Sequence, residues 1–152
     1  MKDFSILIIK PEAIENKEKI IISLNKRGYK IILKKEFTNW RNTMAKIYKE
    51  FSSEEIETYI KGYDQHKFGD KFIILLLTHK KGNTLQRLKE EKGNFINYQK
   101  KKENSLRGEF GLPEKYNTKY RGITFVYCGV HCPENEEELE LQLKMFDISL
   151  SE

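Results

Sequence analysis

Two unbroken apolar runs constrain the fold of this chain more than any other feature. The first, Phe-Ser-Ile-Leu-Ile-Ile, occupies residues 4–9, and the second occupies residues 72–78. Short apolar runs that contain β-branched residues and are bounded by polar segments are typical of central strands covered on both faces. The chain must therefore supply helices for the two faces of a sheet.

The segment after the first run has the signals of a helix that turns back to a second strand. Pro11 cannot continue a central strand but suits the first position of a helix, and Gly28 suits the position just after its end. We therefore expect a helix that reaches Arg27, followed by a strand over residues 29–37.

Capping residues predict the remaining helices. Asn42 can cap a segment through Phe51, and the run that starts at Ser52 has the spacing of a capping box. These two helices would form a hairpin that ends at about Lys61. The other expected elements are a helix capped by Asn83 and Gln86 that runs through Lys92, an irregular stretch over 93–122, a strand over 124–130 and a helix over 136–146.

The last of these helices carries a conflict of patterns. Leu139, Leu141 and Leu143 alternate with polar residues as they would in a strand. The segment is nevertheless composed of good helix formers, and Asn135 and Glu138 have capping-box spacing. The composition therefore favours a helix over a strand.

Length and composition place the chain among globular domains. It has 152 residues, 38% of them hydrophobic and 34% charged, which suits one domain over residues 1–152. The apolar runs are far shorter than the ~20 residues of a membrane-spanning helix. The N-terminus has no secretory pattern, so we expect a cytoplasmic protein with no membrane partner.

The cysteines and the distribution of charge indicate which classes of ligand the chain can bind. Cys128 and Cys132 have no Cys/His cluster around them, so we expect free thiols and no dedicated metal site. The net charge is +5, and lysines crowd residues 80–102 while glutamates crowd residues 134–140. The basic stretch can attract phosphates, nucleotides or nucleic acid, although a solvated helix face is the more common explanation for such runs.

Three short motifs follow one another along the chain. Lys10-Pro11-Glu12 ends the first strand, Arg107-Gly108-Glu109-Phe110 lies in the long irregular stretch, and Gly129-Val130-His131 stands at the end of the strand over 124–130. Together with the order of elements over residues 4–146, they resemble the nucleoside diphosphate kinase family. Each motif alone is weak, but three in order with matching element types are fairly specific.

The resemblance implies a fold. It predicts an α/β (α+β) protein, a ferredoxin-like split β-α-β sandwich with a four-stranded antiparallel sheet covered by helices, plus extra helices and a long loop. It also implies a homo-oligomer, a hexamer, tetramer or dimer. A scaffold of this kind hosts many functions, so the site residues must carry the functional argument.

The resemblance also implies an activity. The chain would be a phosphotransferase that moves the γ-phosphate of a nucleoside triphosphate to a nucleoside diphosphate in a ping-pong cycle. His131 would be the nucleophile and become phosphohistidine, a role for which imidazole suits because its pKa lies near neutrality. His66 and His79 lack a comparable context and are expected to be surface residues. Mg²⁺ would arrive on the nucleotide phosphates.

Several residues match the phosphate- and nucleotide-binding positions of the family. By resemblance, Lys10 would contact the transferring phosphate, Arg107 would clamp phosphate oxygens, and Tyr48 would hydrogen-bond near the histidine. A half-buried helix aromatic is an equally good explanation for Tyr48. The second phosphate-binding arginine of the family falls at either Arg87 or Lys89, and the sequence leaves both open.

The chain departs from the family pattern close to the histidine. Cys128 stands where the family has an asparagine for the ribose, Pro133 replaces a serine, and Gln142 replaces the glutamate that orients the imidazole. No clear match exists for a threonine of the family near residues 93–97, and residues 112–121 form a longer loop. A Gln can accept a ring N–H hydrogen bond but brings no charge.

Two functions from different classes follow from this pattern. The first is an active nucleoside diphosphate kinase, favoured because Lys10, Tyr48, Arg107 and His131 are present together. The alternative is a weakly active or inactive domain of the same fold that serves as a nucleotide-binding or assembly module. Sequence-specific nucleic-acid binding is unlikely from the sequence, because no recognised binding motif accompanies the lysines.

Overall fold

The computed structural model describes residues 3–100 and 103–149. Its main sheet contains β1 (Ser5–Ile9), β2 (Tyr29–Phe37), β3 (Phe72–His79) and β6 (Val130–His131) in the order β2-β3-β1-β6. All neighbouring strands of this sheet run antiparallel. The predicted four-stranded antiparallel sheet of a ferredoxin-like α/β fold is confirmed.

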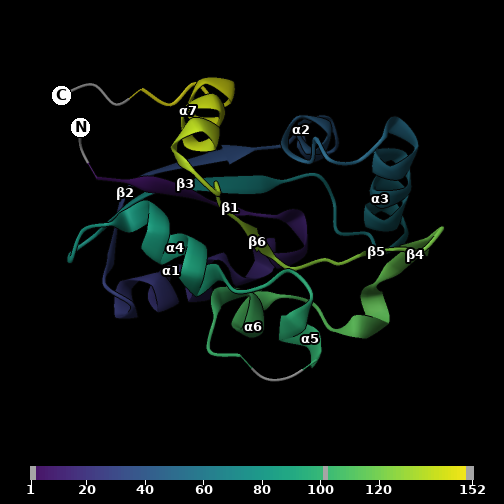
Figure 1. Ribbon diagram of the computed structural model, residues 1–152, viewed down its shortest axis with the longest axis horizontal. Coiled ribbons are helices and arrows are strands. Elements are labelled where there is room, and N and C mark those ends of the chain that lie inside the picture. Colours follow the sequence, from purple (N-terminus) through teal and green to yellow (C-terminus); the bar gives the residue numbers. More distant parts are fainter. Residues whose placement is uncertain (1–2, 101–102, 150–152) are drawn as a thin grey trace.

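Helices cover both faces of the sheet, as the two apolar runs require (Figure 1). One face carries α2 (Trp40–Ile47), α3 (Ser53–Gln65) and α7 (Glu136–Met145). The other carries α1 (Lys17–Lys26), α4 (Thr84–Lys92) and α6 (Leu106–Phe110). The fold is thus a sandwich with an apolar core on each face of the sheet.

Successive residues of the central strand enter different cores. Ile6 and Ile8 pack with the side chains of α2, α3 and α7, whereas Leu7 and Ile9 pack with those of α1, α4 and α6. All four side chains are fully buried. Alternate strand side chains point to opposite faces, so an apolar residue at every position is what a doubly covered strand needs.

The predicted first helix is present but divided. Residues Pro11–Asn16 form a 3₁₀ helix, η1, and α1 begins only at Lys17. The expected stop is confirmed at Gly28, whose φ of +98° is a backbone conformation that glycine adopts without strain. A Cβ at this position would also lie 2.7 Å from Nε2 of His79.

The helical hairpin is confirmed with different boundaries. The prediction of a helix from Asn42 through Phe51 was wrong, because α2 begins at Trp40 and ends at Ile47. It stops there because Tyr48 has a ψ of 67°, outside the helical range. The capping box at Ser52 is present, and α3 continues past Lys61 to Gln65.

The two later helices occupy the predicted segments. The start of α4 is held by Asp3, which accepts hydrogen bonds from the amide and hydroxyl groups of Thr84 at 3.0 and 2.8 Å. Asn83, the predicted cap, makes no side-chain capping bond. In α7 the Asn135 side chain accepts from the Glu138 amide at 2.9 Å, so the helical interpretation is confirmed.

The prediction of one strand over 124–130 was wrong. The segment forms β5 (Ile123–Phe125), which pairs with β4 (Thr118–Tyr120) in a separate hairpin, and then β6 in the main sheet. Gly129, with a φ of +86°, lies at the bend between them. Its carbonyl accepts a hydrogen bond from the Lys10 amide at 2.9 Å. The chain therefore leaves the hairpin with β4 at this point and pairs with β1.

The stretch over 93–122 is more regular than expected. It contains α5 (Asn97–Lys100), α6, the 3₁₀ helix η2 (Glu114–Tyr116) and β4. Each element is at most five residues long, which explains why periodicity did not reveal it. No helix within residues 3–100 and 103–149 has the length and apolar character needed to cross a membrane.

Candidate active site

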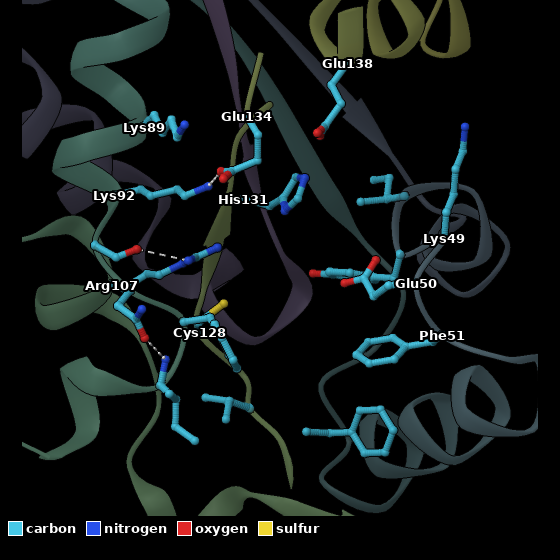
Figure 2. Close-up of a pocket in the computed structure, with 18 of the residues that line it drawn as sticks. Lys49, Glu50, Phe51, Lys89, Lys92, Arg107, Cys128, His131, Glu134 and Glu138 are labelled. Carbon is cyan, nitrogen blue, oxygen red and sulfur yellow. Dashed lines mark hydrogen bonds and ion pairs between the residues drawn. The ribbon is translucent and has the colours of Figure 1, made fainter. Parts of the chain in front are cut away.

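The candidate nucleophile lies at the edge of the main sheet. β6 places His131 opposite Ile8 of β1, directly beside the end of the first strand. A pocket of about 1440 Å³ opens at this point and is lined by His131. Figure 2 shows Lys89, Lys92 and Arg107 on one side of the histidine and Phe51 on the other.

The environment of His131 keeps its imidazole neutral. Burial lowers the pKa of His131 well below its usual value, and the positive charges of Arg107, Lys92 and Lys10 lower it further. Nε2 is buried and has no hydrogen-bond partner among the described residues. A neutral ring retains a lone pair, which is the requirement for nucleophilic attack.

Lys10 lies behind the pocket rather than in its wall. Its side chain is fully buried, and Nζ lies 3.2 Å from Glu12 Oε2. Nζ also donates to Tyr59 Oη at 3.4 Å and to Cys128 Sγ at 3.6 Å. Lys10 does not line the pocket, so the predicted contact between Nζ and a transferring phosphate is not preformed in this structure. The charge of Lys10 nevertheless helps to lower the pKa of His131.

Glu12 joins three segments that meet at the site. Oε2 accepts the Gly129 amide at 2.9 Å in addition to its ion pair with Lys10, and Oε1 accepts the Tyr63 hydroxyl at 2.6 Å. Both oxygens are thus used. The carboxylate ties the end of β1 to α3 and to the residues that lead into His131. Sequence reasoning quoted Glu12 as part of a motif but gave it no role.

Tyr48 lies next to the histidine. The ring centroids of Tyr48 and His131 are 5.7 Å apart, with the rings in an edge-to-face arrangement. Burial raises the pKa of the Tyr48 hydroxyl, so it stays protonated and can donate a hydrogen bond. Lys10 Nζ lies 5.6 Å from the Tyr48 ring centroid, which places the ring over the buried ammonium group.

Arg107 is anchored by carbonyl groups. Its Nε donates to Val130 O at 3.1 Å, and Nη1 donates to Gly93 O at 3.0 Å. Ser105 begins the short helix α6 by accepting the Gly108 amide at 2.9 Å, which fixes the backbone that carries Arg107. The two carbonyls leave Nη2 available beside the pocket that Arg107 lines.

The structure separates the two candidates on α4. Lys89 lines the pocket. Arg87 does not, and its Nε donates to Gly82 O at 2.8 Å at the opposite end of the helix. Since α4 has 3.6 residues per turn, two positions two apart point to different sides. Lys89 is therefore the residue of this pair that can meet a ligand in the pocket.

Cys128 and Gln142 both line the pocket but differ from the expected polar partners. Cys128 is buried, and its sulfur contacts Lys10 Nζ and Val130 O. Gln142 is also buried, and its Oε1 has no hydrogen-bond partner among the described residues. Because Nε2 of His131 is equally unpaired, the expected hydrogen bond from the ring to Gln142 is not formed here.

Sequence reasoning did not select several residues of the pocket. Lys92 and Glu134 form an ion pair beside His131, although both were counted only within charged runs (Figure 2). Phe51 and Phe125 line the pocket on the side of α3, with ring centroids 5.2 Å apart. No short motif marks these residues, because they come from segments far apart in the sequence.

The other histidines lie outside the pocket. His66 is half-buried and its Nε2 lies 2.9 Å from Tyr116 O. The prediction that His79 is a surface residue was wrong, because it is only 6% exposed. Its ring bridges the Arg27 carbonyl, 2.7 Å from Nε2, and the Lys81 amide, 3.0 Å from Nδ1. Among the described histidines, only His131 lines the pocket.

Comparison with solved structures identifies proteins of the same fold. A nucleoside diphosphate kinase of Aquifex aeolicus is 18% identical, with a TM-score of 0.67, covering 97% of this chain and 96% of that chain. The enzyme of Encephalitozoon cuniculi is 16% identical with a TM-score of 0.68, covering 99% and 95%. That of Borrelia burgdorferi, solved as a transition-state mimic with vanadate and ADP, is 13% identical with a TM-score of 0.67, covering 94% and 85%.

Comparison of sequences leads to the same family. A search of the curated proteins finds no match. The family model described as nucleoside diphosphate kinase matches residues 3–147. This match spans nearly the whole chain, including the sheet, both helical layers and the pocket around His131. The chain therefore belongs to the nucleoside diphosphate kinase family.

Proposed function

We propose that His131 carries the phosphoryl group in this nucleoside diphosphate kinase, which acts as one domain over residues 1–152. The observation that carries the proposal is a neutral imidazole at the wall of a pocket among three cationic side chains. Because Nε2 is buried, Nδ1 is the ring nitrogen that can reach a substrate. Nδ1 attacks the γ-phosphorus of a nucleoside triphosphate, and the nucleoside diphosphate leaves.

The second half of the cycle reverses the first. A different nucleoside diphosphate enters the same pocket, and its terminal oxygen takes the phosphoryl group from His131. The imidazole is restored to its neutral state, and a nucleoside triphosphate leaves. One pocket serves both halves because donor and acceptor carry the same groups, which makes the kinetics ping-pong.

Arg107 and Lys89 are proposed to bind the phosphates. Arg107 has two of its nitrogens fixed on carbonyls, so its guanidinium is positioned before the ligand arrives. Lys89 reaches the pocket from α4. Lys10 acts through its charge from behind the wall, where it adds to the effects of burial, Arg107 and Lys92 that keep the imidazole unprotonated. Mg²⁺ would enter on the nucleotide phosphates and neutralise part of their charge.

The aromatic side of the pocket suits the base. Phe51 lies in the connection between α2 and α3, and Phe125 ends β5. Their rings are in edge-to-face contact in this structure. Stacking on an aromatic ring tolerates every base, because each base has a π face. A base that rests against Phe51 would place its phosphates toward His131, which lies across the same pocket (Figure 2).

The departures from the family pattern change the groups that would bind the ribose and orient the imidazole. Cys128 offers the ribose a weak sulfur donor in place of an amide. Pro133 has no side-chain donor, and Gln142 brings no charge to the imidazole. We propose that these changes slow phosphohistidine formation without removing it. The family match favours the kinase over the inactive-module alternative.

The exposed edge of the sheet supports a proposal on assembly, and the free cysteines support one on the cellular compartment. β2 is one of the two outer strands of the sheet, and Ile32 and Leu33 on it are 50% and 39% exposed. An apolar edge strand of this kind suits symmetric pairing with a second copy, so we propose a homo-oligomer built from dimers, testable by sedimentation. Cys128 and Cys132 are free thiols, which fits the reducing cytoplasm.

The test is labelling of the protein with γ-³²P-ATP. Wild type should acquire label that is acid-labile and base-stable, as phosphohistidine is, and unlabelled nucleoside diphosphate should remove it. His131→Ala should acquire none while keeping its circular dichroism spectrum. His66→Ala is the matched control and should label normally, since His66 lies outside the pocket. Label on folded His131→Ala would disprove the assignment.

A further inference from the structure

Lys92 is a cation of the pocket that the mechanism above does not use. It is the last residue of α4, and only 9% of its side chain is exposed. Its ammonium group pairs with the Glu134 carboxylate and lies 3.5 Å from the Cys132 carbonyl. After Arg107, it is the next charge that depresses the pKa of His131. Lys92 and His131 line the same pocket, so the charge of Lys92 is within reach of a ligand bound there.

Glu134 is the more exposed partner of the ion pair with Lys92. It follows β6 by three residues and is 47% exposed, whereas the Lys92 stem is buried. Burial alone would raise the pKa of Glu134, but the hydrogen bond and charge of Lys92, with Lys89 and Arg107 beyond it, lower it overall. The carboxylate thus lies in the field of the same three cations that surround the candidate phosphate position.

We propose that Lys92 is a phosphate-binding residue and that Glu134 occupies its ammonium group until the nucleotide phosphates displace it. The inference rests on the proposed function of the pocket. A buried cation without a partner is costly, so Lys92 needs an anion in the empty site as well as in the occupied one. Glu134 meets this need because it is exposed enough to swing into solvent when a phosphate takes its place.

The exchange favours highly charged ligands. A terminal phosphate offers three oxygens and up to two negative charges, whereas Glu134 offers two oxygens and one charge. Two phosphates that reach Lys92, Lys89 and Arg107 together therefore replace the carboxylate readily. A ligand with a single phosphate has less charge with which to displace it. Glu134 thus sets nucleotide affinity by competition without touching the reacting atoms.

The test is ADP binding measured by calorimetry at constant Mg²⁺ and low salt. ADP is used because it cannot donate a phosphoryl group to His131. Glu134→Gln keeps the shape but removes the competing charge, and should tighten ADP binding by about tenfold, the size of one charge-assisted hydrogen bond. Lys92→Met should weaken ADP binding by a similar factor, because the ammonium group is lost while an unbranched side chain still fills the buried position.

The double variant separates competition from a general charge effect. In the Lys92→Met background, Glu134→Gln should change ADP affinity by less than about twofold, because there is no longer an ammonium group to compete for. Glu137→Gln is the charge control, since Glu137 is exposed in the first turn of α7 and does not line the pocket. It should leave ADP affinity within about twofold of wild type.

Three results would overturn the proposal. They are unchanged or weaker binding in Glu134→Gln, an equal gain in the Lys92→Met background, and an equal gain in Glu137→Gln. Thermal melting of each variant shows whether it is folded, and Lys92→Gln replaces Lys92→Met if the latter does not fold. Absence of ADP binding in wild type would instead defeat the proposed function itself, and this inference with it.

Discussion

Removal of the Glu12 carboxylate should be one of the most destabilising single changes in this protein. The side chains of Glu12 and Lys10 are both fully buried, and Lys10 Nζ lies 3.2 Å from Glu12 Oε2. Glu12→Ala leaves the ammonium group without its anion and the Gly129 amide without its acceptor. Breaking one side of a buried ion pair costs about 3–5 kcal/mol. Total stabilities are only about 5–15 kcal/mol, so this is a large fraction.

The contacts that survive limit the loss. Lys10 keeps its hydrogen bond to Tyr59, although the Tyr63 hydroxyl loses Glu12 as its acceptor. We therefore expect about 4 kcal/mol of destabilisation, or a decrease of about 8–16 °C in Tm for a domain of this size. Glu12→Gln, which keeps the volume and one acceptor oxygen, should recover part of the loss.

The assay is urea unfolding followed by tryptophan fluorescence. The chain has one tryptophan, Trp40, which is 1% exposed and therefore reports the loss of the core. Glu57→Ala is the control, because the Glu57–Lys61 pair is 67% and 74% exposed and should contribute less than about 0.5 kcal/mol. A loss below about 1 kcal/mol in Glu12→Ala, or one equal to that of the control, would refute the reasoning.

Two further predictions concern the histidine. Because burial, Arg107, Lys92 and Lys10 lower the pKa of His131, the rate of phosphohistidine formation should stay constant as pH falls through about 6.5 and decline only below it. Arg107→Gln should move that decline to higher pH in single-turnover labelling, and a wild-type decline centred at 6.5 would contradict the argument. Gln142→Glu should speed phosphohistidine formation several-fold, or by about 1 kcal/mol, if the carboxylate accepts the unpaired Nε2 proton. An unchanged or slower rate at saturating ATP would show that residue 142 does not reach the ring.

The same pKa shift has a consequence for stability. The unfolded chain binds a proton on His131 below about pH 6.5, whereas the folded protein does not until the pH is lower. The contribution of the neutral ring is therefore complete above that pH and is lost progressively as pH falls toward the folded pKa.

Local sequence determined much of the architecture. The runs at 4–9 and 72–78 became β1 and β3 in the middle of the sheet, and Ser52 began α3 with its capping box. These elements follow from interactions within a few residues, so their signals are written in adjacent positions. The conflict in residues 136–146 was also resolved locally, by the Asn135 cap.

Other boundaries depended on contacts distant in sequence. The segment 124–130 reads as one strand, but the Gly129 carbonyl pairs with the Lys10 amide while Ile123–Phe125 pairs with β4. The start of α4 depends on Asp3, which is 81 residues from Thr84. No local pattern encodes such partners, because they come together only when the sheet forms.

Some residues of the candidate site were likewise indicated by the sequence, whereas others were placed only by the tertiary structure. The sequence alone indicated the family and pointed to His131 and Arg107, because each lies in a short motif and the motifs occur in a fixed order. It pointed to Tyr48 only by its position relative to the family pattern. Only the tertiary structure decided that Lys10 is buried behind the pocket and paired with Glu12, that Lys89 rather than Arg87 lines the pocket, and that Lys92 and Glu134 pair beside the histidine. The physical reason is that a charge is governed by its burial and its nearest partners, and these come from strands and helices that are remote in the sequence but adjacent in space.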